Sequence, residues 1–286
     1  MNKVTILGAS GQLGQAITKQ LTEKKYDLNL VTHDNFEAAA DFDKLEQFKD
    51  SDIIINCIAF HDVSRCESEF ALSMKINGDF VKQLAGLCEK NKIVLIHFST
   101  DYIFNGQKKE PYSEDDIPAP VNVYGVSKLA GEMFVKAYCR KHYLMRVASL
   151  FGHKKDNPEK VNFVEKMINA ANEKMPIKVI NDQIMSPTYS TDVARAVTAL
   201  LDKKADYGLY HATNSGSVSW YDFALAIFQL TGQKADISPI SFSEYHADVS
   251  RPQYCSMDNS KIIPYYAMPP WKEALADYLR VKGYIK

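Results

Sequence analysis

The chain has 286 residues, of which 46% are hydrophobic and 24% are charged, a composition typical of a globular protein with a full core. It contains 34 Lys and Arg residues against 35 Asp and Glu residues, so its formal net charge is −1. A charge this close to zero gives no overall field that would attract nucleic acid or an anionic membrane, and we expect neither as a partner.

The cysteines and the first residues indicate the cellular compartment. The five cysteines are odd in number and include no C-x-x-C pair, which indicates reduced thiols. The chain starts M-N-K-V-T-I-L-G and leads directly into a predicted strand, without the pattern of a signal peptide. Its apolar runs are far shorter than the ~18 residues needed to span a bilayer. We therefore expect a cytoplasmic protein.

The first predicted unit is a strand, a glycine turn and a helix. Residues 4–7 are apolar, and the pattern G-x-x-G-x-x-G follows at Gly8, Gly11 and Gly14 before an amphipathic helix. In such a unit the first glycine permits the tight turn, the second lets the backbone approach a pyrophosphate, and the third lets the helix pack on the strand. The pattern predicts a dinucleotide-binding turn; the alternative is an ordinary strand-to-helix turn.

Residues 28–31 predict the second strand, and Asp34 follows it 20 positions after Gly14. An acid at this spacing would accept hydrogen bonds from a ribose 2′-hydroxyl and disfavour a 2′-phosphate. A solvated loop acid explains Asp34 equally well, so the choice between NADH and NADPH stays open. Residues 52–59 predict a third, buried strand whose end should pass beside the cofactor.

The next segment offers polar groups without a clear role. His, Asp, Cys and Glu side chains occur within residues 61–67, but no set has the spacing of metal ligands, and we expect no metal site. Residues 74–87 predict a helix that contains Asn77. An Asn in the middle of a helix is usually solvated, so Asn77 is predicted to lie at the surface.

A catalytic pair is predicted after the strand at residues 93–98. Tyr124 and Lys128 stand four apart in a helix signalled by Pro118, Pro120 and Asn122, so the two side chains share one face. A cation beside the phenol can lower its pKa from ~10 to about 7, which takes roughly 4 kcal/mol. A tyrosine with that pKa is a usable acid or base at neutral pH.

The end of the same strand adds hydroxyl groups. Ser99 and Thr100 close the apolar run at the edge where open parallel sheets bind ligands, and their hydroxyls can hydrogen-bond a carbonyl or an alkoxide. The Tyr-x-x-x-Lys spacing alone is weak, because about two such pairs with Lys or Arg are expected by chance in this composition. A surface pair is therefore the alternative to the catalytic interpretation.

The remaining elements complete the predicted fold. Further strands are predicted at residues 143–150, 176–180 and 208–212. Further helices are predicted at residues 163–171, 191–201 and 219–230, and a loop at residues 181–188. We predict an α/β fold with a doubly wound parallel sheet (Rossmann) and a smaller mixed α/β substrate-binding lobe. Residues 1–150, completed by parts of 176–212, would form the dinucleotide-binding domain, and residues 151–286 mainly the substrate lobe.

Together, the motifs G-A-S-G-Q-L-G, S-T-D-Y-I-F-N-G, Y-G-V-S-K-L-A-G-E, V-I-N-D-Q-x-x-S-P-T and R-P resemble those of extended short-chain dehydrogenases/reductases. Within them the chain is most similar to the dTDP-4-dehydrorhamnose reductase branch. The resemblance covers almost the whole chain. It implies that NADPH or NADH reduces the C4 keto group of a nucleotide-activated 6-deoxy sugar, such as dTDP-4-dehydro-L-rhamnose, and that the protein can form a homodimer.

The resemblance also implies roles for individual residues. The catalytic set is Thr100, Tyr124 and Lys128. The pyrophosphate would be held by Gly8, Ser10, Gly11, Gln12 and Leu13. The adenine would lie near Asp41 and Phe42, and the nicotinamide ribose near Ala59, Tyr124 and Lys128. The residues expected to face the substrate are Val63, Asp101, Tyr102 and Arg251.

Three positions depart from the family pattern. Gln15 replaces an acid that is implicated in a metal-bridged dimer, Leu150 replaces a Trp near the sugar, and Ser64 stands where the family often has Asp. The identity of the sugar therefore stays open. The alternatives are another nucleotide-sugar reductase, an epimerase, or a non-catalytic regulatory subunit of the methionine adenosyltransferase-associated type.

Overall fold

The computed structural model describes residues 2–153, 161–245 and 248–286, so residues 154–160 of the loop predicted after Gly152 lie outside the described part. Its main sheet has six strands, all in parallel pairs. In spatial order they are β10 (Gly208–His211), β5 (His142–Val147), β4 (Val94–Thr100), β3 (Ile53–Asn56), β1 (Lys3–Leu7) and β2 (Asp27–Val31). β3, with the sequence Ile-Ile-Ile-Asn, is buried throughout, as expected for a parallel sheet covered on both faces.

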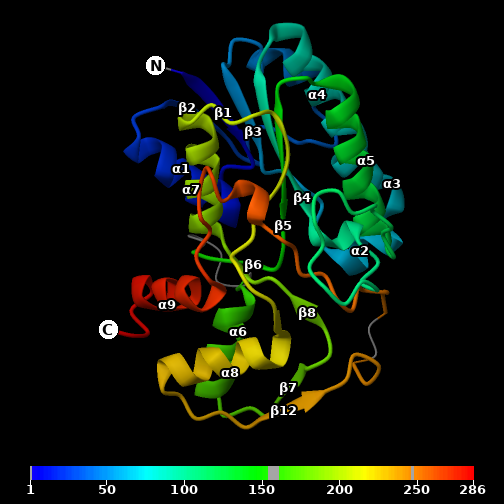
Figure 1. Cartoon of the computed structure of the whole chain (residues 1–286). Coiled ribbons are helices and arrows are strands. Elements are labelled where there is room, and N and C mark those ends of the chain that lie inside the picture. The colour runs from blue at the N-terminus through cyan, green and yellow to red at the C-terminus, as the bar shows by residue number, and fades with distance from the viewer. Residues whose placement is uncertain (1, 154–160, 246–247) are drawn as a thin grey trace.

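Helices cover both faces of this sheet (Figure 1). α1 (Gln12–Glu23) and α7 (Ser190–Asp202) pack on one face and share an apolar core with the central strands. α4 (Phe80–Asn91) and α5 (Val123–Tyr138) cover the other face and contribute to a second core. The predicted doubly wound α/β fold is therefore confirmed.

The strand order places one edge of the sheet for ligand binding. β2 lies on one side of β1 and β3 on the other, so the winding reverses at β1. Open parallel sheets bind ligands at such a switch point, outside the carboxyl ends of the strands. Gly8 follows β1 and Thr100 ends β4, so both lie at this edge.

The carboxyl-terminal part lies beyond that edge (Figure 1). Its helices are α6 (Phe163–Asn172), α8 (Trp220–Thr231) and α9 (Trp271–Val281), and they share a third apolar core. Its strands are short: β7 (Ile177–Ile180) pairs with β12 (Ile237–Ile240), β6 (Leu150–Phe151) with β9 (Thr188–Tyr189), and β8 (Ile184–Met185) with β11 (Val218–Ser219). α7 and β10 come from the same half of the sequence but pack with the main sheet.

The shorter helices connect these elements. They are η1 (Phe42–Phe48), α2 (Val63–Ser68), α3 (Phe70–Met74), η2 (Lys75–Asp79), η3 (Asp101–Ile103) and η4 (Ser260–Ile262). η2 is a π-helical turn between α3 and α4.

Several predicted boundaries differ from the structure, and the loop predicted at residues 181–188 contains β8 and the first residue of β9. The strand predicted at residues 52–59 ends at Asn56, whose side-chain oxygen accepts a hydrogen bond from the Ile58 N–H and turns the chain. The helix predicted at residues 74–87 starts earlier, in α3. The strand predicted at residues 143–150 is divided into β5 and β6 around Ser149, whose φ is 41°.

Candidate active site

The glycine turn after β1 has no room for side chains where the helix meets the strand. Gly8 has a φ of +78°, and its N–H donates to the Val31 oxygen at 2.9 Å. A Cβ atom on Gly14 would lie 2.2 Å from the Gly8 oxygen, so the first turn of α1 sits directly on this loop. These two glycines therefore have the conformational and packing roles that the sequence predicts for them.

The amino terminus of α1 is open to an anion. Its N-cap residue is Gly11, so no side chain caps the free N–H groups of the first turn. Ser10 is exposed, Gln12 is half-buried, and Leu13 is buried below them. Backbone N–H groups at a helix amino terminus favour phosphate, so the arrangement fits the pyrophosphate of a dinucleotide.

The expected adenine side lies after β2. Asp41 accepts a hydrogen bond from the Glu37 N–H at 2.8 Å and contacts the Lys44 ammonium at 2.8 Å, and both lower the pKa of its carboxyl. The half-buried ring of Phe42 lies 6.3 Å from the ring of Phe80. Asp34 is exposed, and the Thr32 hydroxyl donates to it at 3.4 Å. This geometry does not choose between a ribose 2′-hydroxyl and a 2′-phosphate.

The end of β4 forms a chain of short contacts. The Thr100 hydroxyl donates a hydrogen bond to Asp101 Oδ1 at 3.0 Å, and its oxygen accepts one from the Tyr102 N–H at 3.2 Å. Thr100 and Asp101 are both buried. Burial raises the pKa of the Asp101 carboxyl to about 6, and the nearby Cys255 thiol and the Thr100 hydroxyl only partly offset this rise.

Tyr124 lies in the first turn of α5, next to this chain. The helix starts here because the side chain of Asn122 accepts the Gly125 N–H at 2.8 Å and caps it. The Tyr124 ring meets the Tyr102 ring edge to face, with centroids 5.8 Å apart. The Thr100 hydroxyl is close enough to the Tyr124 phenol to favour its ionised form.

The predicted lowering of the tyrosine pKa is wrong for this structure. Burial raises the pKa of Tyr124 well above its ordinary value, and the nearby Thr100 hydroxyl only partly offsets this rise. Lys128 is buried one turn along the same helix, but its ammonium donates to the Phe98 oxygen at 2.6 Å. Burial also lowers the pKa of Lys128 to about 8, so its charge is itself weakened.

The other predicted site residues lie on two segments, one in the carboxyl-terminal part and one after β3. Arg251 is half-buried, and its guanidinium lies 6.0 Å from the centre of the Tyr245 ring. Burial raises the pKa of Tyr102, and the charge of Arg251 only partly offsets this rise. Val63 is the first residue of α2, and Ala59 lies in the loop between β3 and that helix. Burial raises the pKa of Cys57, two residues before Ala59, and the charge of Lys128 partly offsets this rise, so the loop passes close to the ammonium.

Asn77 is a residue that the sequence prediction missed. It is buried in the π-helical turn η2, not solvated. Its amide bonds both the N–H and the oxygen of Phe60 at 2.9 Å, and it donates to Ser127 at 3.0 Å. Asn77 therefore ties the loop after β3 to the residue before Lys128. The Asn77-Gly78 pair, two poor helix formers in one helix, is the sequence signal that could have found it.

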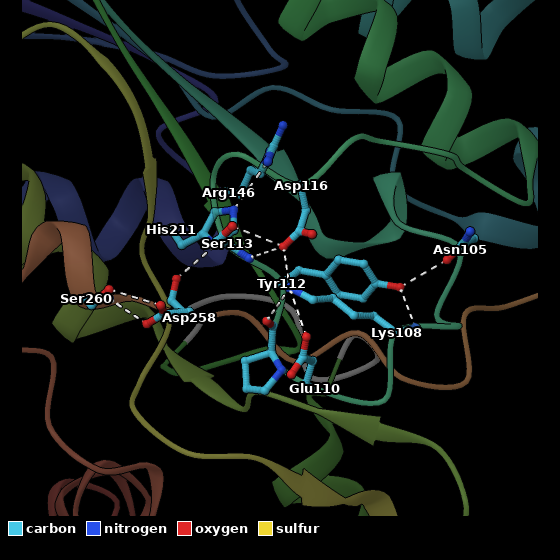
Figure 2. A network of polar contacts seen from close by, with 11 residues as sticks. Asn105, Lys108, Glu110, Tyr112, Ser113, Asp116, Arg146, His211, Asp258 and Ser260 are labelled. Carbon is cyan, nitrogen blue, oxygen red and sulfur yellow. Dashed lines mark hydrogen bonds and ion pairs between the residues drawn. The ribbon is translucent and has the colours of Figure 1, made fainter.

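A loop after β4 joins the sheet to the carboxyl-terminal part (Figure 2). Tyr112 donates its N–H to the Ser256 oxygen at 2.9 Å and accepts the Asp258 N–H at 2.8 Å. Figure 2 shows the Tyr112 hydroxyl bonded to Asn105, and Asp116 bonded to both Lys108 and Ser113. These contacts hold residues 256–258, directly after Cys255, against the loop that follows β4.

The described ranges contain no cluster of three or more His, Cys, Asp or Glu side chains that could hold a metal ion. No helix within them is long and apolar enough to cross a bilayer. All five cysteines are free.

The whole chain is similar to proteins of one family. The family model described as RmlD substrate binding domain matches residues 1–283. The chain is 35% identical to the spore coat polysaccharide biosynthesis protein SpsK of Bacillus subtilis, with 99% of each chain covered. It is 32% identical to dTDP-4-dehydrorhamnose reductase of Aggregatibacter actinomycetemcomitans, with 96% of this chain and 97% of that one covered.

A solved structure gives the same result. The crystal structure of dTDP-4-dehydrorhamnose reductase from Bacillus anthracis, in complex with NADP, matches this chain with a TM-score of 0.91 and 33% identity. The match covers 98% of this chain and 99% of that one.

Proposed function

The chain belongs to the family of the RmlD substrate binding domain, and from this membership we propose that it is an oxidoreductase that uses NADPH or NADH to reduce the C4 keto group of a nucleotide-activated 6-deoxy sugar. The favoured substrate is dTDP-4-dehydro-L-rhamnose, because relatives that match over almost their whole length carry the name of that reductase. The observation that carries the proposal is the gathering of Thr100, Tyr124 and Lys128 at the sheet edge that the glycine turn also occupies.

The cofactor would be held by the turn and by two loops. The open first turn of α1, with Gly8, Ser10, Gly11, Gln12 and Leu13, receives the pyrophosphate. Asp41 and Phe42 would contact the adenine, and the nicotinamide ribose would be held by Ala59, Tyr124 and Lys128. When bound, the nicotinamide supplies the hydride.

The side chains of this protein supply the proton for the reduction and position the groups that react. Tyr124 donates its phenolic proton to the C4 oxygen of the sugar. Because burial raises the pKa of Tyr124, the phenol is protonated at neutral pH, as the reductive direction requires. The Thr100 hydroxyl orients the sugar carbonyl. Lys128, anchored on Phe98, holds the ribose with its ammonium.

The substrate would lie between the sheet edge and the carboxyl-terminal part. Asp101 and Tyr102 line the sheet side, Val63 lines the α2 side, and Arg251 supplies a guanidinium for the nucleotide phosphates. Residues 151–286 thus act mainly as a substrate lobe on the dinucleotide-binding domain of residues 1–150. We further propose that the protein works in the cytoplasm and forms a homodimer without a bridging metal.

The proposal is tested with the purified protein, NADPH or NADH, and a panel of nucleotide 4-keto-6-deoxy sugars. We expect the cofactor to be oxidised in proportion to the sugar reduced, with no partner protein present. An epimerase would return the hydride and show no net oxidation. Tight cofactor binding without turnover on the whole panel, in a folded protein, would favour a regulatory subunit; the names of the reductase relatives do not favour either alternative.

A further inference from the structure

Two groups in the site compete for one hydrogen atom. A threonine hydroxyl has a single hydrogen to donate. In the structure Thr100 donates it to Asp101 Oδ1 at 3.0 Å, while its oxygen accepts the Tyr102 N–H. The Tyr124 phenol is near the same hydroxyl, because Thr100 partly offsets the rise that burial causes in the pKa of Tyr124. Thr100 cannot donate this hydrogen to Asp101 and, at the same time, to the Tyr124 oxygen or a sugar carbonyl.

Asp101 is placed so that its charge can change. It is 2% exposed, and its Oδ2 has no hydrogen-bond partner of ordinary geometry among the described residues. The ionisable groups that face it are Tyr102 beside it, Tyr124 on α5, and Cys255 in the carboxyl-terminal segment, with Arg251 acting through Tyr102. None of them is an anion at neutral pH, and no cation forms an ion pair with Asp101 in the described ranges. Loss of solvation therefore dominates at this carboxyl.

We propose that Asp101 sets the direction of the Thr100 hydroxyl: ionised Asp101 holds the Thr100 hydrogen, and protonated Asp101 releases it toward Tyr124 and the sugar carbonyl. The inference rests on the proposed reductase function and makes Asp101 a positioning residue that acts through Thr100. No covalent bond changes in this step. Asp101 takes one proton from solvent, and Thr100 keeps its own.

The expected consequence is a limb in the pH profile of kcat. Since the pKa of Asp101 is about 6, Thr100 is free to donate below that pH and is held above it. Removal of one hydrogen-bond donor from a developing oxyanion lowers kcat by about 10² to 10³. Because Tyr124 still donates to the oxyanion, we expect a smaller effect, namely a fall in kcat of about tenfold as the pH rises from 5 to 8.

Asp101→Asn is the first test, because the amide has the same shape and does not ionise. From pH 5 to 8, we expect the kcat of this variant to stay near the value that the native protein has at pH 5. The KM for the sugar should change less with pH and with the substitution than kcat does. Glu114→Gln is the matched control, since Glu114 is another carboxyl whose pKa burial raises, and it should keep the limb. A limb that persists in Asp101→Asn would overturn the proposal.

The second test does not depend on turnover. The Asp101 carboxyl is titrated by ¹³C NMR in the native protein and in Thr100→Val and Thr100→Ser. A hydrogen bond to the ionised form lowers a carboxyl pKa, so Thr100→Val should raise the pKa of Asp101 above about 6, while Thr100→Ser should leave it in place. An unchanged value in Thr100→Val would refute the inference. If this shift is seen but no sugar is reduced, the proposed function fails and the switch of the hydroxyl stands.

Discussion

Lys128 donates a 2.6 Å hydrogen bond to the main-chain oxygen of Phe98, two residues before Thr100 ends β4. The ammonium is therefore fixed to the strand on which the substrate-facing hydroxyl lies. A lysine held in this way keeps its place whether or not its charge is present, and its pKa of about 8 means that the charge is lost within an accessible pH range.

From this pKa we predict that cofactor affinity depends on pH. Lys128 is charged below about pH 8 and neutral above it, so NADH should bind more weakly as pH rises through that value. A hydrogen bond to a charged group contributes about 1.5–3 kcal/mol, so the loss should be about tenfold or more between pH 6.5 and 9.5. Fluorescence titration measures it. Lys128→Met should bind weakly at every pH, whereas Lys136→Met, two turns further along α5, should keep the native pH dependence.

Tyr124→Phe should lower kcat by about 10² to 10⁴ without unfolding the protein, because it removes the proposed proton donor and keeps the ring that packs on Tyr102. Tyr138→Phe is the matched control on the same helix, since Tyr138 is 46% exposed and far from the first turn. The measurement is steady-state turnover beside a thermal melt. Near-native kcat in Tyr124→Phe would refute its role as the acid.

Gly14→Ala and Gly86→Ala should act in opposite directions. A Cβ atom on Gly14 would lie 2.2 Å from the Gly8 oxygen, so α1 must move away from the turn, which should cost about 1–3 kcal/mol and weaken cofactor binding. A Cβ atom on Gly86 meets nothing within 4 Å inside α4, so Gly86→Ala should raise the free energy of unfolding by about 0.5–1 kcal/mol. Denaturant unfolding distinguishes them; native cofactor affinity in Gly14→Ala would contradict the close packing described for the turn.

Glu132→Gln should be among the most destabilising single changes. Glu132 and Arg146 are almost wholly buried, and Arg146 donates two hydrogen bonds to Glu132, at 2.9 and 2.8 Å. Figure 2 shows Arg146 beside His211. Removing one partner leaves a buried charge unpaired, at a cost of about 3–5 kcal/mol. Glu89→Gln at the exposed Arg140 pair should cost under about 1 kcal/mol. Equal losses in the two variants would show that burial does not decide the cost.

Chelation should leave turnover and assembly unchanged. The family resemblance implies a metal-bridging acid at position 15, where this chain has Gln15, and Mg²⁺ needs charged oxygens to offset its dehydration. The assay is turnover and size-exclusion chromatography with and without EDTA. Loss on chelation with recovery on Mg²⁺ would show that other carboxylates bind the ion.

The sequence by itself determined the local units. The apolar run before Gly8, the glycine spacing, and the helix that begins after Asn122 are each set by interactions between residues close in the chain, namely burial periodicity, turn conformation and capping. Alternation of such units predicts the doubly wound sheet, and the carboxyl ends of parallel strands then place Thr100 at the edge occupied by the glycine turn.

Only the tertiary structure decided the burial, the hydrogen-bond partners and the pKa shifts of the site side chains. The spacing of Tyr124 and Lys128 puts them on one helix face, but it cannot show that Phe98 takes the ammonium or that burial raises the pKa of the phenol. Asn77 is buried because Phe60 and Ser127, distant in sequence, meet its amide. Solvation and hydrogen-bond partners depend on atoms that long-range packing brings together, and periodicity along the chain carries no information about them.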